Sequence, residues 1–228
     1  MKKAGIIGGL GPETTAKFYM EVIFACSKIS EQRPNIVISN VSLPLDVEKE
    51  VITEAKNKER LLPFLIVSAK QLEKSGADFI VIPCNTVHVF IDQIRKSVKI
   101  PVLSIVDETV DFLASKHINK VGLLGTKITV EEHLFDEKLK KNGTELIALT
   151  ERDQKKLGEI INHLVNSSQT NKDKIKLLRI IENHTLKNTD CILLACTDLQ
   201  LLIRYHREIK IFDTLDILKE ATIRKITS

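Results

Sequence analysis

The sequence has no tryptophan, and aromatic residues make up only 4% of its 228 residues. Surfaces that bind nucleic acid combine basic runs with aromatic residues on which bases stack. No such run occurs here, where 34 basic residues are spread among 30 acidic ones. No apolar run approaches the roughly 20 residues that a transmembrane helix needs, and the N-terminal apolar stretch is broken by glycines and reaches a charge by Glu13, unlike a signal peptide. We therefore expect a cytoplasmic protein that binds neither nucleic acid nor membrane.

Cysteine is scarce as well, with four residues at positions 26, 84, 191 and 196. Thiols in the cytosol are mostly reduced, so these residues are considered for chemistry or packing before disulfides. No C-x-x-C pair and no pair of histidines at ligand spacing accompanies them, and we expect no metal site. Cys26, in an expected helix, and Cys191, in an expected strand, fit the packing role that is usual for cysteine.

What the sequence does contain is an alternation of short apolar runs and amphipathic stretches. The runs, often rich in Val and Ile, predict strands at 3–8, 36–40, 78–82, 101–105, 120–125, 145–149, 190–194 and 209–212. Helix-length stretches lie between most of them, for example 13–29, 58–75, 130–141 and 174–186. Strands that are apolar on both faces and alternate with helices are typical of parallel sheets covered by helices. The pattern predicts an α/β fold.

Two landmarks of the sequence recur at nearly the same spacing. The segment KAGIIGGLGPETTAKFYMEVI resembles KVGLLGTKITVEEHLFDEKLK, and the equivalent Gly5 and Gly122 are 117 positions apart. Cys84 and Cys196 are 112 positions apart. One match alone would be weak evidence, but two at one spacing predict a duplication. We expect two pseudo-symmetric lobes, each a parallel sheet flanked by helices: residues 1–99 with 208–228, and residues 100–207.

The two cysteines of this repeat follow their strands in the same way. In ADFIVIPCNT and in TDCILLACTD an Asp precedes the Cys by six residues, and hydroxyl or amide side chains come after it. Ligands of open parallel sheets bind at the carboxyl ends of strands, where residues 85–86 and 197–198 also predict helix starts. N–H groups at a helix start stabilise a thiolate and can hold a carboxylate. If the lobes face one another across a cleft, Cys84 and Cys196 flank one substrate, which suits moving a proton from one face of a carbon to the other.

The motifs GIIGGLGPETT, PCNTVH and ACTDL, in that order and at these spacings, resemble those of the aspartate/glutamate racemase family, in particular its aspartate racemase branch. The resemblance extends over essentially the whole chain. It implies a cofactor-independent amino-acid racemase with two pseudo-symmetric α/β lobes, an active site in the cleft between them, an amino acid as substrate and a homodimeric assembly. By the same resemblance Cys84 and Cys196 match the catalytic thiol pair. The residues that match the substrate site are Leu10, Asn85, Thr86, Val87, Thr126 and Thr197.

One part of the resemblance is incomplete. Aspartate racemases commonly carry Pro-Asp-Arg in the loop after the second strand, and its Arg holds the side-chain carboxylate of the substrate. The aligned stretch LPLDVEKE has Leu-Asp-Val at 45–47 and no Arg, so Lys49 is the candidate substitute. The branch also commonly has Gly and Glu where this chain has Ala195 and Asp198. The resemblance implies interconversion of L- and D-aspartate, with glutamate or other amino acids as further substrates.

Other interpretations stay open. GIIGGLGP resembles a dinucleotide-binding turn, although its glycines do not fit G-x-G-x-x-G. His88 suits either the orientation of a catalytic group or a hydrogen bond to nearby backbone, and His133 and Asp198 are undecided between functional and structural roles. The rival functions are a small-carboxylate binding or regulatory module and a related isomerase of the superfamily.

Overall fold

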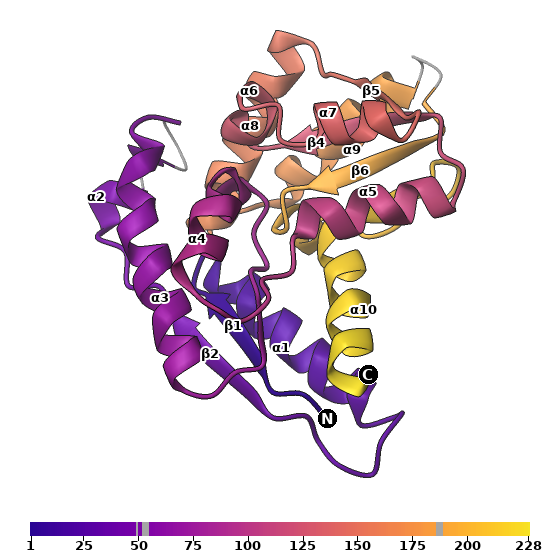
Figure 1. The fold of residues 1–228 in the computed structure, drawn as a ribbon. Coiled ribbons are helices and arrows are strands. Elements are labelled where there is room, and N and C mark those ends of the chain that lie inside the picture. Colours follow the sequence, from indigo (N-terminus) through magenta and orange to yellow (C-terminus); the bar gives the residue numbers. More distant parts are fainter. Residues whose placement is uncertain (49, 52–54, 186–188) are drawn as a thin grey trace. The chain divides into compact units, whose positions relative to one another are not determined.

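The computed structural model describes residues 1–48, 50–51, 55–185 and 189–228 (Figure 1). These residues form two compact units, one comprising Met1–Glu108 with Leu215–Ser228 and the other Thr109–Thr214. We call them the first unit and the second unit.

A three-stranded parallel sheet lies at the centre of the first unit. β1 (Ala4–Gly8) is paired on one side with β2 (Ile36–Asn40) and on the other with β3 (Phe79–Val81). A side chain at Gly5 would meet Leu72 of α3 (Leu62–Lys74), and one at Gly8 would meet Thr15 of α1 (Pro12–Cys26). Because residues three apart in a strand point to opposite faces, α1 and α3 cover opposite faces of this sheet. The other elements are α2 (Leu45–Glu48), the 3-10 helices η2 (Lys58–Leu61) and η3 (Thr86–Phe90), and α4 (Ile91–Ser97).

The second unit is built around a four-stranded parallel sheet with the order β5-β4-β6-β7. Its strands are β4 (Lys120–Gly125), β5 (Glu145–Ile147), β6 (Cys191–Ala195) and β7 (Ile211–Asp213). A side chain at Gly122 would meet His184 of α9 (Asn171–Thr185), and one at Gly125 would meet Thr129 of α6 (Lys127–Glu131), so these helices also lie on opposite faces. The other elements are α7 (Asp136–Lys141), α8 (Glu151–Val165) and the 3-10 helix η4 (Leu199–Leu201). Buried apolar side chains of α8, α9, β4 and β6 form one core cluster.

The second unit repeats the topology of the first. In the first sheet β1 lies between β2 and β3, and in the second sheet β4 lies between β5 and β6. In each case one neighbour is the next strand in sequence, and the other is the strand that leads to Cys84 or Cys196. The helix contacts recur with it, because Gly5 and Gly8 correspond to Gly122 and Gly125 at the same offset. The predicted α/β class, with two parallel sheets flanked by helices, is confirmed.

The chain passes between the units twice, and both passages lie near the start of a helix. Most of α5 (Ile105–Ser115) belongs to the second unit, where Phe112 packs edge-on against Phe212 of β7 with ring centres 5.0 Å apart. Nearly all of α10 (Thr214–Thr227) belongs to the first unit, where Lys219 pairs with Glu21 of α1 at 3.6 Å. Each repeat therefore supplies its last helix to the other unit.

Sheet pairing places the unit boundaries differently from the lobe boundaries expected from the sequence. Residues 100–108 belong to the first unit, where Val102 forms a bridge with Ile80 of β3. Residues 208–214 belong to the second, because β7 extends the sheet beside β6.

One of the predicted strands and one of the predicted helices differ from the structure. The strand predicted at 101–105 is reduced to the single bridge at Val102, because the hydroxyl of Ser104 accepts a hydrogen bond from the N–H of Asp107 at 3.1 Å and so starts α5. The helix predicted at 130–141 is broken between α6 and α7, where His133 has a φ of 50° that a right-handed helix does not accommodate. The other predicted strands overlap observed ones, and those at 36–40 and 120–125 match residue for residue.

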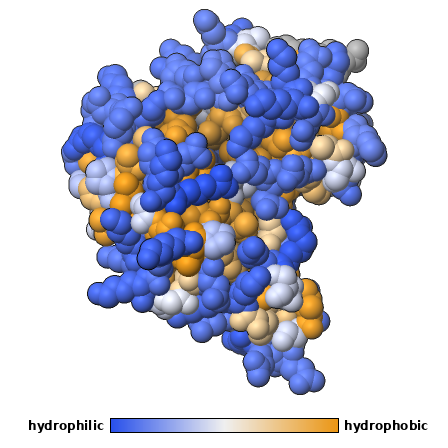
Figure 2. All heavy atoms as spheres, in the orientation of Figure 1, coloured by the Kyte–Doolittle hydropathy of each residue, from blue (hydrophilic) through white to orange (hydrophobic). Residues whose placement is uncertain are grey.

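Hydrophilic side chains cover most of the face drawn in Figure 2. Among the helices in the described part of the chain, none is both long and apolar enough to cross a membrane.

Candidate active site

Cys84 lies just beyond β3, at the carboxyl edge of the first sheet. Its N–H donates to the carbonyl of Ile82 at 2.8 Å, which closes a three-residue turn around Pro83. The fixed φ of proline suits the middle position of such a turn. The turn ends the strand and leaves the Cys84 side chain, 8% exposed, at the edge where ligands of parallel sheets bind.

The carbonyl of Cys84 is bound by the side chain of His88. His88 Nδ1 lies 2.7 Å from Cys84 O, and Nε2 lies 3.1 Å from the backbone N of Ile105, the first residue of α5. A backbone N–H can only donate, so Nε2 accepts; a carbonyl can only accept, so Nδ1 carries the proton. His88 is therefore a neutral, buried histidine that is hydrogen-bonded to nearby backbone.

The contact lies where the chain after Cys84 forms a 3-10 helix. In an α-helix the N–H of His88 would bind the carbonyl four residues earlier, and here that carbonyl accepts from the imidazole. The His88 N–H instead binds Asn85 O at 2.9 Å, as a 3-10 turn requires. Asn85, Thr86 and Val87 lie in this turn, and none is more than 4% exposed.

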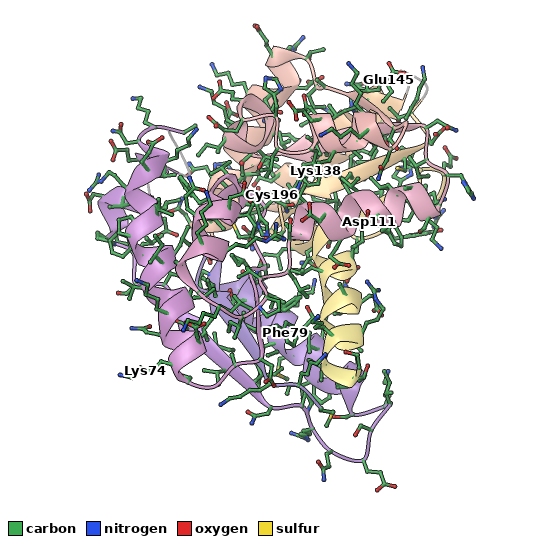
Figure 3. All side chains as sticks on the ribbon, viewed as in Figure 1. Lys74, Phe79, Asp111, Lys138, Glu145 and Cys196 are labelled. Carbon is green, nitrogen blue, oxygen red and sulfur yellow. The ribbon has the colours of Figure 1, made fainter. Side chains whose placement is uncertain are left out.

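Cys196 occupies the equivalent position beyond β6 (Figure 3) and is 6% exposed. Here Gln200 Nε2 donates to the carbonyl of Thr197 at 3.0 Å. In an α-helix that carbonyl would bind the N–H of Leu201, which instead bonds one residue further along, at Asp198 O. The helix start predicted at 197–198 therefore leads only to the three-residue 3-10 helix η4.

Thr126 lies beside Cys196 at the edge of the second sheet. The register pairs Gly125 with Ala195, so the next residue of each strand is Thr126 and Cys196. The Thr126 hydroxyl oxygen accepts from the N–H of Thr129 at 3.2 Å and caps α6. With Thr197, 2% exposed, these residues gather at one sheet edge.

The turn after β1 is held by Thr15, which the sequence interpretation missed. Thr15 Oγ1 accepts from the N–H of Gly9 at 3.0 Å and donates to the carbonyl of Gly11 at 2.9 Å. Gly9 and Gly11 have φ values of 85° and 69°, which glycine adopts without strain. The turn carries Leu10, 9% exposed, at the same sheet edge as Cys84. The sequence signal for this role of Thr15 is its position: a hydroxyl residue one helical turn after Gly11, the last glycine of the turn.

The loop after β2 contains an ion-pair cluster. Arg60 Nη2 lies 3.0 Å from Asp46 Oδ2, and its Nη1 pairs with Glu50. Hydrogen bonds from Arg60 hold the pKa of both carboxyls below the usual range. Lys49, the predicted distal ligand, lies outside the described residues. Arg60 was not singled out in the sequence, and its charge is matched by two carboxylates.

The Asp that precedes each cysteine by six residues lies at the other end of its strand. Asp78 Oδ2 accepts from the backbone N–H of Lys3 at 2.6 Å. Asp190 Oδ2 accepts from the N–H groups of Asn119 and Lys120 at 2.7 and 2.9 Å. Both carboxylates therefore tie the cysteine-bearing strand to the start of the central strand, away from the thiols.

His133, Cys26 and Cys191 fit structural roles. His133 is 72% exposed at its side chain and pairs with Asp136 at 2.8 Å. Burial raises the pKa of the Cys26 thiol, and it raises that of Cys191 to about 12, in agreement with a packing role. Asp198 is 7% exposed beside Cys196. Within the described residues no group of three or more His, Cys, Asp or Glu side chains is placed to hold a metal ion.

A family model described as Asp/Glu/hydantoin racemase matches residues 7–222. The chain belongs to this racemase family. It is 29% identical to the broad specificity amino-acid racemase RacX of Bacillus subtilis (strain 168) over 96% of each chain. The Picrophilus torridus aspartate racemase is 25% identical, with a TM-score of 0.83 over 100% of this racemase and 95% of that one. An aspartate racemase homologue from Pyrococcus horikoshii OT3 is 28% identical, with a TM-score of 0.80 over 100% of both chains.

Membership of this family confirms the resemblance that the three sequence motifs indicate. It identifies the protein as an isomerase of the racemase type.

Proposed function

We propose that this racemase acts on amino acids without a cofactor, with Cys84 and Cys196 as two bases on opposite faces of the substrate α-carbon. The observation that carries the proposal is the recurrence of one local arrangement. Each cysteine follows the equivalent strand of a parallel sheet, at its carboxyl edge, and a 3-10 turn comes after it. One thiol from each repeat provides what inversion needs: a group that removes the proton and another that supplies one.

The α-proton of an amino acid is very weakly acidic, so the charge left after its removal needs preorganised donors. The proposed donors are the backbone N–H groups of the turns after the two cysteines, together with the side chains of Asn85, Thr86, Thr126 and Thr197. They bind the α-carboxylate and stabilise the charge that develops on it. Exclusion of water around the substrate strengthens each of these interactions.

The proton balance requires one thiolate and one thiol in the resting enzyme. The thiolate takes the α-proton and becomes a thiol, while the other thiol gives its proton to the opposite face of the carbanion and becomes a thiolate. The roles are reversed for the other enantiomer. The two groups therefore titrate as a coupled pair, and kcat/KM is expected to be bell-shaped in pH.

For the substrate, we propose that aspartate is turned over with little preference over other amino acids. The relatives of this chain include an aspartate racemase and a broad specificity amino-acid racemase. Weak discrimination between aspartate and other amino acids is supported by the ion pairs in the loop after β2, where Arg60 is paired with Asp46 and Glu50. Kinetics of Lys49→Ala test the lysine: an unchanged kcat/KM for aspartate would exclude it as the distal ligand.

Racemisation in D₂O tests the two-base arrangement. During initial turnover of L-aspartate, deuterium should enter the D-product while recovered L-aspartate stays largely protiated, because the incoming proton comes from the other thiol. Cys84→Ala and Cys196→Ala should each abolish racemisation. Cys26→Ala is the matched control, since this cysteine is fully buried in α1 and should affect stability only. Near wild-type racemisation by either of the first two variants would refute the thiol pair.

A carboxylate-binding module on the same scaffold is the rival function. Thermal shift with a panel of amino and dicarboxylic acids, beside a polarimetric assay of D/L interconversion, distinguishes the two. Binding without turnover would support the rival.

A further inference from the structure

We infer that His88 is a positioning residue for Cys84 and acts through the peptide group between Cys84 and Asn85. The inference rests on the proposed function, because it concerns how one of the two thiols and its nearest carboxylate donor are held.

The orientation of this peptide group follows from the contact with the imidazole. No cis peptide bond occurs in the described chain, so the C=O and N–H of the Cys84–Asn85 peptide point in opposite directions. The Nδ1–H of His88 binds the C=O at 2.7 Å. The N–H of Asn85 therefore points away from His88, and it is the first backbone donor after the thiol.

The imidazole is itself held in one state. Its Nε2 accepts from the N–H of Ile105 at 3.1 Å, at the start of α5, where backbone N–H groups have no partner inside the helix. A protonated ring, or the other neutral tautomer, would lose this contact. On the other side of Cys84, the backbone N–H binds Ile82 O at 2.8 Å. The backbone of Cys84 is thus fixed at both its N–H and its C=O.

The residue at the equivalent position after the second cysteine makes a different contact. Four positions after Cys196 stands Gln200, whose amide binds Thr197 O instead. The carbonyl of Cys196 accepts the backbone N–H of Leu199 at 3.1 Å. The imidazole of His88 binds the carbonyl of Cys84 itself, whereas the amide of Gln200 binds the carbonyl of the residue after Cys196. Removal of the imidazole should therefore slow proton transfer at Cys84 and leave transfer at Cys196 unchanged.

This asymmetry has a kinetic signature. Transfer at Cys84 is deprotonation for one enantiomer and reprotonation for the other. When this step becomes slower, the α-deuterium isotope effect on kcat/KM rises for the enantiomer whose C–H bond is broken at Cys84. It falls for the opposite enantiomer, because reprotonation then limits the rate. A loss of active protein through poor folding changes neither isotope effect.

The experiment measures kcat/KM for both enantiomers of aspartate, protiated and α-deuterated, in wild type and His88→Phe. The phenylalanine removes both the donor and the acceptor. We expect kcat/KM to fall by up to about 100-fold, the cost of misplacing a reacting group by roughly 1 Å, with isotope effects that change in opposite directions. His88→Asn, with a shorter amide in place of the ring, should give the same pair of changes at smaller size, and it decides the test if His88→Phe does not fold.

The matched control is His184→Asn. His184 is 2% exposed, and its Nε2 lies 2.9 Å from Ile147 O in the second unit, so it is a comparably buried histidine on a backbone carbonyl. This variant should melt at a lower temperature and keep both isotope effects. Wild-type isotope effects in active His88 variants would overturn the positioning role alone. Wild-type enzyme that racemises no amino acid would overturn the proposed function instead.

Discussion

Replacement of Asp190 by Ala should destabilise the protein about twice as much as replacement of Asp78 by Ala, and neither change should impair catalysis. Asp190 accepts two backbone hydrogen bonds, at 2.7 and 2.9 Å, and Asp78 accepts one, at 2.6 Å. Both residues are exposed, so each bond is expected to contribute only about 1 kcal/mol. The expected losses are about 2 and about 1 kcal/mol, or about 4–8 °C and about 2–4 °C in melting temperature for a chain of this length.

Differential scanning calorimetry measures these shifts, and a racemisation assay well below the melting temperature measures activity per folded molecule. Asp190→Asn and Asp78→Asn serve as controls, because an amide oxygen still accepts the bonds but more weakly; they should lose less than the alanine variants. Equal losses for the two aspartates would contradict the count of hydrogen bonds. Loss of racemisation by folded Asp78→Ala would place this carboxylate in the chemistry and refute its role in joining the strands.

Three further predictions concern other single groups. Thr15→Val should cost about 2 kcal/mol of unfolding free energy in a urea titration, because it leaves a backbone N–H of the glycine turn without its acceptor; a Thr15→Ser variant equally destabilised would contradict this. Burial raises the pKa of Cys191 to about 12, so its thiol should resist maleimide at pH 8 until the protein is denatured; stability should fall as pH rises above about 8.5 toward that value, because only the unfolded state ionises there. Asp46→Asn combined with Glu50→Gln should release Arg60 and raise kcat/KM for aspartate relative to alanine by about 10-fold, equivalent to one charge-assisted hydrogen bond of about 1.5 kcal/mol; an unchanged ratio would show that Arg60 does not reach the substrate.

Strand positions were predictable where an apolar run ends in a turn residue. The strand at 120–125 ends at Gly125 and matches residue for residue, whereas the run at 101–105 also contains Val, Leu and Ile but has only one residue that pairs with β3. Pairing depends on neighbours distant in sequence, which an apolar run does not reveal. The 3-10 turns after the cysteines were not predicted for a different reason. There the side chains of His88 and Gln200 bind backbone carbonyls that would accept main-chain hydrogen bonds in an α-helix, and the sequence does not reveal these contacts.

Some residues of the candidate site were likewise predictable from the sequence, and others were not. Cys84 and Cys196 are visible in the sequence because the motif around them occurs twice. Thr15 and Arg60 were not identified, because each occurs once and its partners, four to fourteen positions away, meet it only in the folded chain. Such contacts within loops depend on the folded chain. For the loop after β2, the sequence showed that the Arg of aspartate racemases is missing, but it did not show the ion pairs of Arg60.

The placement of α10 has a consequence for synthesis of the chain. Leu215 and Leu218 of this helix are fully buried, and Ile226 O accepts the N–H of Lys2 at 2.9 Å, so the last residues complete a unit that the first residues begin. Segments leave the ribosome from the N-terminus onward. When α10 is still being translated, every segment of the second unit has already been synthesised, while the first unit lacks a helix. The first unit, although its sheet is synthesised first, can therefore complete its fold only after the whole second unit has been synthesised, and a chain that terminates before α10 leaves its N-terminal sheet without that helix.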